Sequence, residues 1–141
     1  MHTKTIVTIC AMLLTAPALA QDKITTFRVD GLIISKARYD SLKIERDHIT
    51  KIRSLPPAQA ASAYGSRASA GVAEITTSKM FVVKSASGAV QSTADPLEKA
   101  TMLSSITEAR ILRMRNIDAQ TLQKEFGKEC SGGGVVVYLR E

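Results

Sequence analysis

The amino-acid sequence predicts an α+β fold made of two strand-strand-helix-strand units that share a mixed sheet. Short runs of β-branched residues alternate with Asp-Gly, Pro-Pro and Gly punctuation, and alanine- or leucine-rich segments suited to helices lie between them. The pattern of the first half also returns in the second half. Ile49, Ile52 and Leu55 have apolar counterparts 62 residues later, and Gly65 and Gly71 have glycine counterparts at the same offset. We interpret this spacing as an internal duplication, with two independently similar α/β units as the alternative.

The first twenty residues have the features of a secretory signal peptide. Lys4 precedes an apolar run at residues 6–14, and Ala18-Leu19-Ala20 provides the small residues that signal peptidase requires. We expect cleavage after Ala20 and, because no later segment approaches about 18 apolar residues, no membrane span afterwards. The residue directly after the cleavage point is Gln21 and not a cysteine, so a lipid anchor is not expected. The expected location of the mature chain is periplasmic or outer-membrane associated.

Composition argues against several function classes. Removal of Lys4 lowers the formal net charge from +6 to +5, and His48 and Cys130 are then the only histidine and cysteine. One cysteine cannot close an intramolecular disulfide, and one histidine with one cysteine cannot form a metal cluster. We interpret the modest basic excess as ordinary solvation, because an exported protein seldom meets nucleic acid. No metal, cofactor or nucleic-acid partner is therefore expected.

The first half divides into short strands and one helix. Pro56-Pro57 ends the strand before it because proline cannot donate to a ladder, and Pro57 suits the start of the alanine-rich helix that follows. Gly65 comes directly after that helix, where we expect a positive φ and a left-handed cap. In order, the expected elements are a strand at 25–29, a turn at Asp30-Gly31 leading into 32–34, a charged segment at 36–48, a strand at 49–55, a helix at 58–64 and a strand at 72–77.

The second half repeats this order after a boundary near Lys79-Met80. Residues 80–84 are expected to form a strand followed by a Ser/Ala/Gly-rich loop through Thr93, and Asp95-Pro96 begins a helix over 97–103. Residues 135–139 correspond to the strand at 72–77. The expected core residues of the two units are Ile49, Ile52, Leu55, Val72, Ile75, Ile111, Met114, Ile117, Val135 and Val137.

Residues 64–77 carry a specific combination of short motifs. Tyr64-Gly65-Ser66-Arg67 is followed, after a three-residue gap, by Gly71-Val72 and then by Ile75-Thr76-Thr77. In this order the motifs resemble the plug domain of TonB-dependent outer-membrane receptors, above all the receptors for large nutrients such as glycans. Val29-Asp30-Gly31 stands where that family has a Val/Ile-Asp-Gly strand end. The resemblance implies a plug-like unit at 21–79 and a second, divergent plug-like unit at 80–141.

The chain also departs from the receptor pattern. A TonB-dependent receptor encloses its plug in a barrel of about 22 strands, which we do not expect 141 residues to encode. Pro56-Pro57 replaces the Lys-Gly or Lys-Asp turn usual in the family, and Ala68 stands where many members have glycine. We therefore expect the plug-like fold to carry over and the transport activity not to.

The expected function is that of an exported, non-catalytic interaction module that binds an envelope protein. The binding surface would be the one that a plug turns toward its barrel, and Ser66, Arg67 and Ser69 are the predicted contact residues. The same loop could instead be an ordinary solvated turn. A small periplasmic binding protein for a peptide or glycan is the alternative function. The sequence favours no particular oligomeric state.

No enzymatic activity is expected. His48 and Cys130 could be paired as base and nucleophile, but His48 lies in a charged segment typical of surface residues. Glu125 and Glu129 lie four residues apart among alternating charges, which is typical of a solvated helix face. The glycine run at 132–134 lacks the Lys-Ser/Thr of a phosphate loop and is interpreted as a flexible strand entry.

Overall fold

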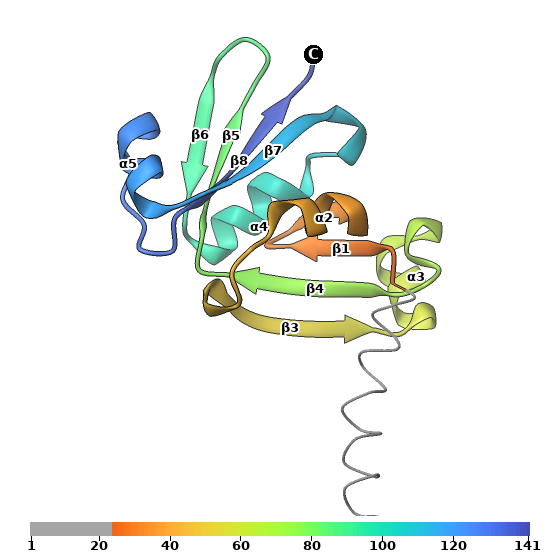
Figure 1. Ribbon diagram of the computed structural model, residues 1–141. Helices are drawn as coiled ribbons and strands as arrows, with labels where there is room; N and C mark the ends of the chain where they lie inside the picture. The colour runs from red at the N-terminus through yellow and green to blue at the C-terminus, as the bar shows by residue number, and fades with distance from the viewer. Residues whose placement is uncertain (1–23) are drawn as a thin grey trace, which may run out of the picture.

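A computed structural model describes residues 24–141, which form two four-stranded mixed sheets with helices between and beside them (Figure 1). The signal peptide expected at residues 1–20 lies outside the described residues. The strand order is β2-β1-β4-β3 in the first sheet, sheet A, and β6-β5-β8-β7 in the second, sheet B. In each sheet a parallel central pair is flanked by an antiparallel strand on either side. The predicted α+β fold with two similar units is confirmed.

The element boundaries follow the same order in both units. Sheet A consists of β1 (Thr26–Val29), β2 (Leu32–Ser35), β3 (Ile49–Leu55) and β4 (Val72–Thr77), and sheet B of β5 (Met80–Lys84), β6 (Val90–Thr93), β7 (Ile111–Ile117) and β8 (Gly134–Leu139). The α-helices are α2 (Lys36–Leu42), α3 (Pro57–Tyr64), α4 (Pro96–Ser104) and α5 (Ala119–Phe126). Short 3₁₀ helices are η1 (Arg46–His48), η2 (Ser66–Ala68) and η3 (Glu108–Arg110).

Local sequence explains where the later helices begin. Pro96 starts α4, and the Asp95 carboxylate accepts a hydrogen bond from the Glu98 amide at 3.0 Å. The Asp118 carboxylate caps α5 in the same way, accepting from the Thr121 amide at 2.7 Å. These contacts satisfy amides that have no partner within the helix.

The offset of 62 residues seen in the sequence also holds in the backbone. Gly71 and Gly133 both have positive φ, at 102° and 77°. A Cβ added to Gly71 would lie 2.8 Å from the Leu55 carbonyl oxygen, and one added to Gly133 would lie 2.3 Å from the Ile117 carbonyl oxygen. Both glycines therefore let the chain pass close to the end of an edge strand, at equivalent points of the two units.

The two units share a hydrophobic core rather than a sheet. Val29, Ile34 and Ile75 of sheet A belong to the same buried cluster as Phe81 and Val137 of sheet B. The prediction of one shared mixed sheet is therefore wrong. Each unit pairs its own first and last strands in parallel, so its sheet is complete by itself and only the inner faces of the two sheets meet.

Two further elements differ from the expectation. The charged segment that begins at Lys36 opens with helix α2, whose start is capped because the Ser35 hydroxyl accepts from the Arg38 amide at 3.3 Å. The loop expected before Thr93 contains strand β6, which pairs with β5 through a turn around Gly88. Gly65 has the predicted positive φ of 80°, but its ψ of −164° lies outside the left-handed helical region. Left-handed caps are instead found at Gly127, with φ 66° and ψ 25°, and at Lys43 after α2, with φ 51° and ψ 47°.

Most of the predicted core residues are buried, and one is not. Ile49 and Met114 are half-buried, whereas Ile52 is 50% exposed, so its assignment to the core is wrong. Ile52 is on β3, which is an edge strand of sheet A. The buried members of the predicted set are Leu55, Val72, Ile75, Ile111, Ile117, Val135 and Val137.

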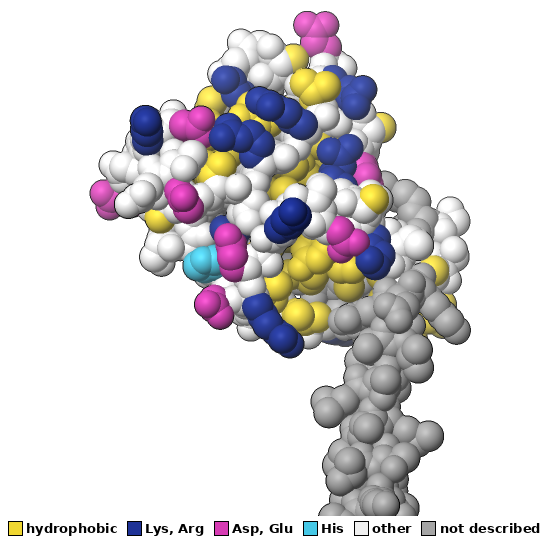
Figure 2. Space-filling view, viewed as in Figure 1, with side chains coloured by type: hydrophobic (Ala, Val, Ile, Leu, Met, Phe, Trp, Pro, Cys, Tyr) yellow, Lys and Arg dark blue, Asp and Glu magenta, His cyan; other side chains and the backbone are white. Residues whose placement is uncertain are grey.

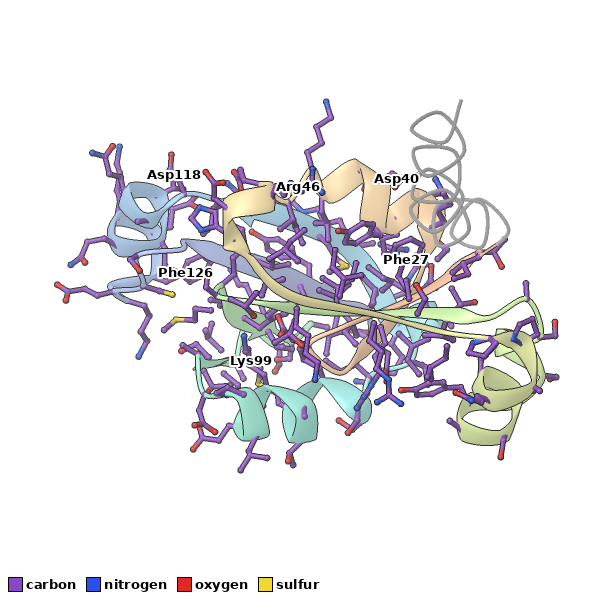
Figure 3. All side chains as sticks on the ribbon, turned by 90° about the horizontal axis from the view of Figure 1, so that it is seen from below. Phe27, Asp40, Arg46, Lys99, Asp118 and Phe126 are labelled. Carbon is purple, nitrogen blue, oxygen red and sulfur yellow. The ribbon has the colours of Figure 1, made fainter. Side chains whose placement is uncertain are left out.

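A buried polar network joins the two units. Lys99 points from α4 toward the strands (Figure 3), and its Nζ lies 3.3 Å from Asp30 Oδ2. The same Nζ donates to the carbonyl oxygens of Thr77 and Lys79, both at 3.0 Å, and the Asp30 carboxylate accepts from the Thr77 amide at 3.0 Å. Lys79 Nζ donates in turn to the Gly132 carbonyl oxygen at 2.7 Å. Because each charge has partners, the network can be buried.

Candidate functional site

The predicted contact loop lies at one end of sheet A. Ser66 and Ser69 are exposed, and the Ser69 amide donates to the Ser66 carbonyl oxygen at 3.2 Å. The side chain of Arg67 lies outside the part of the chain that the structure describes. Ala68 is buried beside Leu55, the last residue of β3. The loop therefore lies beside the end of the edge strand β3, which sequence reasoning did not identify as part of the site.

Strand β3 presents different side chains to the two faces of sheet A. Its register with β4 places Ile52 beside Ile75, whose side chain belongs to the core. The same register places Lys51 beside Thr76 and Arg53 beside Glu74, on the opposite, outer face. The residues of β3 from 50 to 54 are all exposed. The strand thus has an apolar inner side and a basic outer side, and it lies at the edge of the sheet.

A groove lined by both apolar and charged side chains lies on the inner side of β3. It has a volume of about 270 Å³, and Figure 2 shows hydrophobic side chains around a hollow between α2 and β3. The Phe27 and Tyr39 rings stack at a centroid distance of 4.5 Å in its wall. Burial, followed by the nearby Asp40 charge, raises the pKa of Tyr39 above its usual value. The residues that line the groove are Phe27, Lys36, Tyr39, Asp40, Ile52, Ala73 and Ile75.

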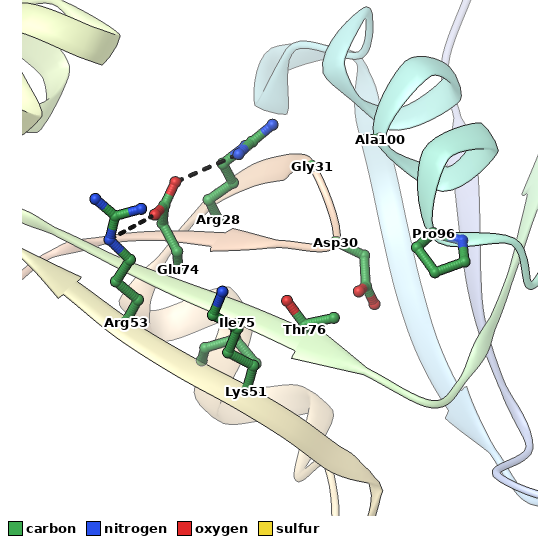
Figure 4. A pocket seen from close by; sticks show the side chains of 10 residues that line it. All are labelled: Arg28, Asp30, Gly31, Lys51, Arg53, Glu74, Ile75, Thr76, Pro96 and Ala100. Carbon is green, nitrogen blue, oxygen red and sulfur yellow. Dashed lines mark hydrogen bonds and ion pairs between the residues drawn. The ribbon is translucent and has the colours of Figure 1, made fainter.

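A row of charges crosses the outer face of sheet A (Figure 4). Glu74 of β4 lies between two guanidinium groups, with its Oε2 3.3 Å from Arg28 Nη1 and its Oε1 3.9 Å from Arg53 Nε. The Tyr64 hydroxyl also donates to Glu74. Burial, together with this hydrogen bond, raises the pKa of Tyr64. Lys51 borders the same cavity of about 290 Å³, which the Asp30 side chain also lines.

The equivalent outer face of sheet B is apolar and covered. Val82 and Val136 pair in the register that Arg28 and Glu74 have in sheet A. These valines form a buried cluster with Leu122 of α5, and Phe126 of the same helix packs against it. At this position the outer face of sheet B is therefore packed against α5, whereas sheet A has an ion pair there. Near the end of β3, the outer face of sheet A is also covered, because Leu55 and Val72 are buried with Ala60 of α3.

The two edge strands β3 and β7 also differ in how far the rest of the protein covers them. Both contain basic–apolar–basic triplets at equivalent positions, Lys51-Ile52-Arg53 and Arg113-Met114-Arg115. Met114 is half-buried against the core and α2 contacts β7, while Ile52 is 50% exposed. The repeated triplet is the sequence signal that could have identified this site.

The residues weighed for catalysis lie apart from the groove. Cys130 Sγ donates to the Ser78 carbonyl oxygen at 3.3 Å, and His48 borders another cavity with Lys79 and Asp118. The glycine run at 132–134 is buried and packed, not loose: a Cβ on Gly132 would lie 2.7 Å from the Ser78 carbonyl oxygen. Within residues 24–141, no group of three or more His, Cys, Asp or Glu side chains could hold a metal ion.

Comparisons of the chain with protein-family models, with curated proteins and with solved structures found no match. Among the helices of residues 24–141, none is long and apolar enough to cross a membrane.

Proposed function

We propose that the protein is a non-catalytic interaction module that binds a partner protein along the β3 side of sheet A. The observation that carries this proposal is the half-exposed Ile52, which lies on an edge strand beside a groove that also contains the Phe27 and Tyr39 rings. An exposed apolar side chain beside unpaired strand backbone promotes aggregation unless a partner covers it. Val90 and Leu112, on the two edge strands of sheet B, are exposed to a similar extent, at 47% and 57%. Ile52 differs from them because it borders the groove that Phe27 and Tyr39 line.

The dimensions of the groove favour a protein segment over a small molecule. Its volume of about 270 Å³ lies below the roughly 300–1,000 Å³ of typical small-molecule sites. An extended segment that pairs with β3 would gain main-chain hydrogen bonds and could place a side chain in the groove. The small-ligand alternative would use another site, such as the cavity of about 430 Å³ between β6 and α4.

From the resemblance to receptor plugs we infer where the partner is located. Plug surfaces normally contact a barrel wall, and the signal-like residues 1–20 favour export, so we propose a partner in the cell envelope. Ser66, Arg67 and Ser69 adjoin the end of β3 and would extend the same surface. Because Arg67 and β3 are both basic, an acidic partner surface fits them best.

Site-specific photo-crosslinking tests this proposal. A photoreactive amino acid is placed at Ile52, and in a control protein at Leu97, which is 80% exposed on α4. Both proteins are irradiated in envelope extract, and crosslinked products are separated and identified by mass spectrometry. We expect one protein to be crosslinked from position 52 and not from position 97. The same products from both positions, or none from position 52, would contradict the proposal.

A further inference from the structure

We infer, resting on the proposed function, that the ligand of β3 is an extended acidic segment that adds to sheet A as a fifth strand. Its central feature is one apolar side chain flanked on both sides by Asp or Glu. The inference follows from the alternation along β3, from the charge surplus beside it, and from a comparison with β7.

The alternation fixes which side chains of an added strand meet which surface. Successive residues of a strand point to opposite faces, and directly paired residues of neighbouring strands lie on the same face. A residue paired with Ile52 would therefore lie over the groove formed by Phe27, Ala73 and Ile75. Its two neighbours would lie beside Lys51 and Arg53 on the outer face.

The charges on the outer face favour carboxylates at those two positions. Glu74 is shared between Arg28 at 3.3 Å, Arg53 at 3.9 Å and the Tyr64 hydroxyl. The Arg53 side chain is still 63% exposed, and Lys51 is exposed next to it. One glutamate therefore cannot neutralise the row, and two added carboxylates would each meet a basic side chain.

Other occupants fit the edge less well. Two copies of β3 paired antiparallel around Ile52 would place Lys51 of each copy opposite Arg53 of the other, and directly opposed like charges destabilise a strand pair. A helix could fill the groove but could not supply hydrogen bonds to the backbone edge of β3, because its own amides and carbonyls are paired internally. A strand satisfies both the edge and the groove.

Strand β7 shows what the same triplet looks like when its contacts are made within the chain. The Arg113 guanidinium lies 4.3 Å from the centre of the Tyr138 ring. Arg115 lies 3.3 Å from Glu125 and donates to the Tyr138 hydroxyl at 3.0 Å. Met114 packs against the core. Arg113 is thus a matched control: a basic residue on an edge strand outside the inferred site.

The test uses two short synthetic peptides with the same Thr-rich flanks and either Glu-Val-Glu or Lys-Val-Lys at the centre. Binding to the wild type and to Lys51→Glu/Arg53→Glu is followed by amide chemical shifts. We expect the acidic peptide to bind the wild type at least about tenfold more tightly than the basic peptide, with shifts along β3. The double variant should reverse this preference, and Arg113→Glu should leave it unchanged.

Methylated peptides separate strand addition from binding by charge alone. N-methylation of the peptide amides on the edge facing β3 should abolish binding, because it removes donors and blocks pairing. Equal binding of the two peptides, no binding of the acidic peptide, or undiminished binding after N-methylation would overturn the inference. If these tests fail while residue 52 still crosslinks one partner, the inference is wrong and the proposed function stands. Loss of the crosslink would overturn the proposed function itself.

Discussion

Gly65 and Gly127 end the equivalent helices α3 and α5 in different backbone conformations. Gly127 is left-handed helical, whereas Gly65, at φ 80° and ψ −164°, occupies a region open almost only to glycine. A Cβ would meet nothing within 4 Å at either position, so substitution tests the backbone alone. We expect Gly65→Ala to lower the free energy of unfolding by about 1–3 kcal/mol and Gly127→Ala by about 1–2 kcal/mol, measured by urea denaturation.

Asparagine provides the control for this comparison. Asn tolerates the left-handed helical region, so Gly127→Asn should recover much of the stability lost in Gly127→Ala. Asn does not tolerate the conformation of Gly65, which lies outside the left-handed helical region. Gly65→Asn should therefore be as destabilised as Gly65→Ala. Equal recovery at both positions would contradict the conformational assignment of Gly65.

Asp118 gives helix α5 a pH-dependent start. The hydrogen bond from the Thr121 amide lowers the pKa of Asp118 below its usual value. A lowered pKa in the folded state contributes stability that is fully present above the unfolded pKa of about 3.9 and is lost as the pH falls through the folded value. We expect Asp118→Asn, which keeps a cap but does not titrate, to lose less stability than the wild type as the pH falls below about 4. Thermal melts at a series of pH values measure the difference, and parallel curves would disprove it.

At the scale of single elements, the edge strand β3 and the central strand β8 should respond differently to truncation. Ile52 is half exposed, so Ile52→Ala should cost less than about 1 kcal/mol. Val137 is fully buried between β5 and β7, and Val137→Ala should cost on the order of 1–4 kcal/mol. Denaturation midpoints compare the two variants. A larger loss for Ile52→Ala would mean that its groove is covered in solution.

The elements also show how far the sequence alone could lead. Pro57, Asp95 and the glycines at 65 and 71 punctuate the chain locally, so helices α3 and α4 and the strands beside them were predicted close to their observed ranges. The prediction that Ile52 is a core residue is wrong because it rests on the repeated pattern of Ile49, Ile52 and Leu55, which does not show that β3 is an edge strand. The exposure of Ile52 depends on the order of the strands and on which edge strand α2 contacts, and the local sequence pattern predicts neither. The candidate site along β3 could not be predicted from the sequence for the same reason.

On the scale of the whole molecule, the buried pair of Lys99 and Asp30 ties α4 to sheet A. Their side chains are 1% and 2% exposed. Removing one partner of a buried ion pair leaves an uncompensated charge, so Lys99→Met should lower the free energy of unfolding by about 3–5 kcal/mol.

Both units should still unfold in one transition, because they share a core. Circular dichroism and the fluorescence of tyrosine should give coincident melts. Two separate transitions would show that the units are independent.

The place of β8 in sheet B has a consequence for folding. Strand β8 lies in the middle of sheet B, where it pairs with β5, more than fifty residues earlier, and with β7. Without β8, strands β5 and β7 are not joined, because neither pairs with the other. Pairings between residues so distant in sequence form slowly. Sheet B is therefore expected to form late, when β8 takes its place between β5 and β7.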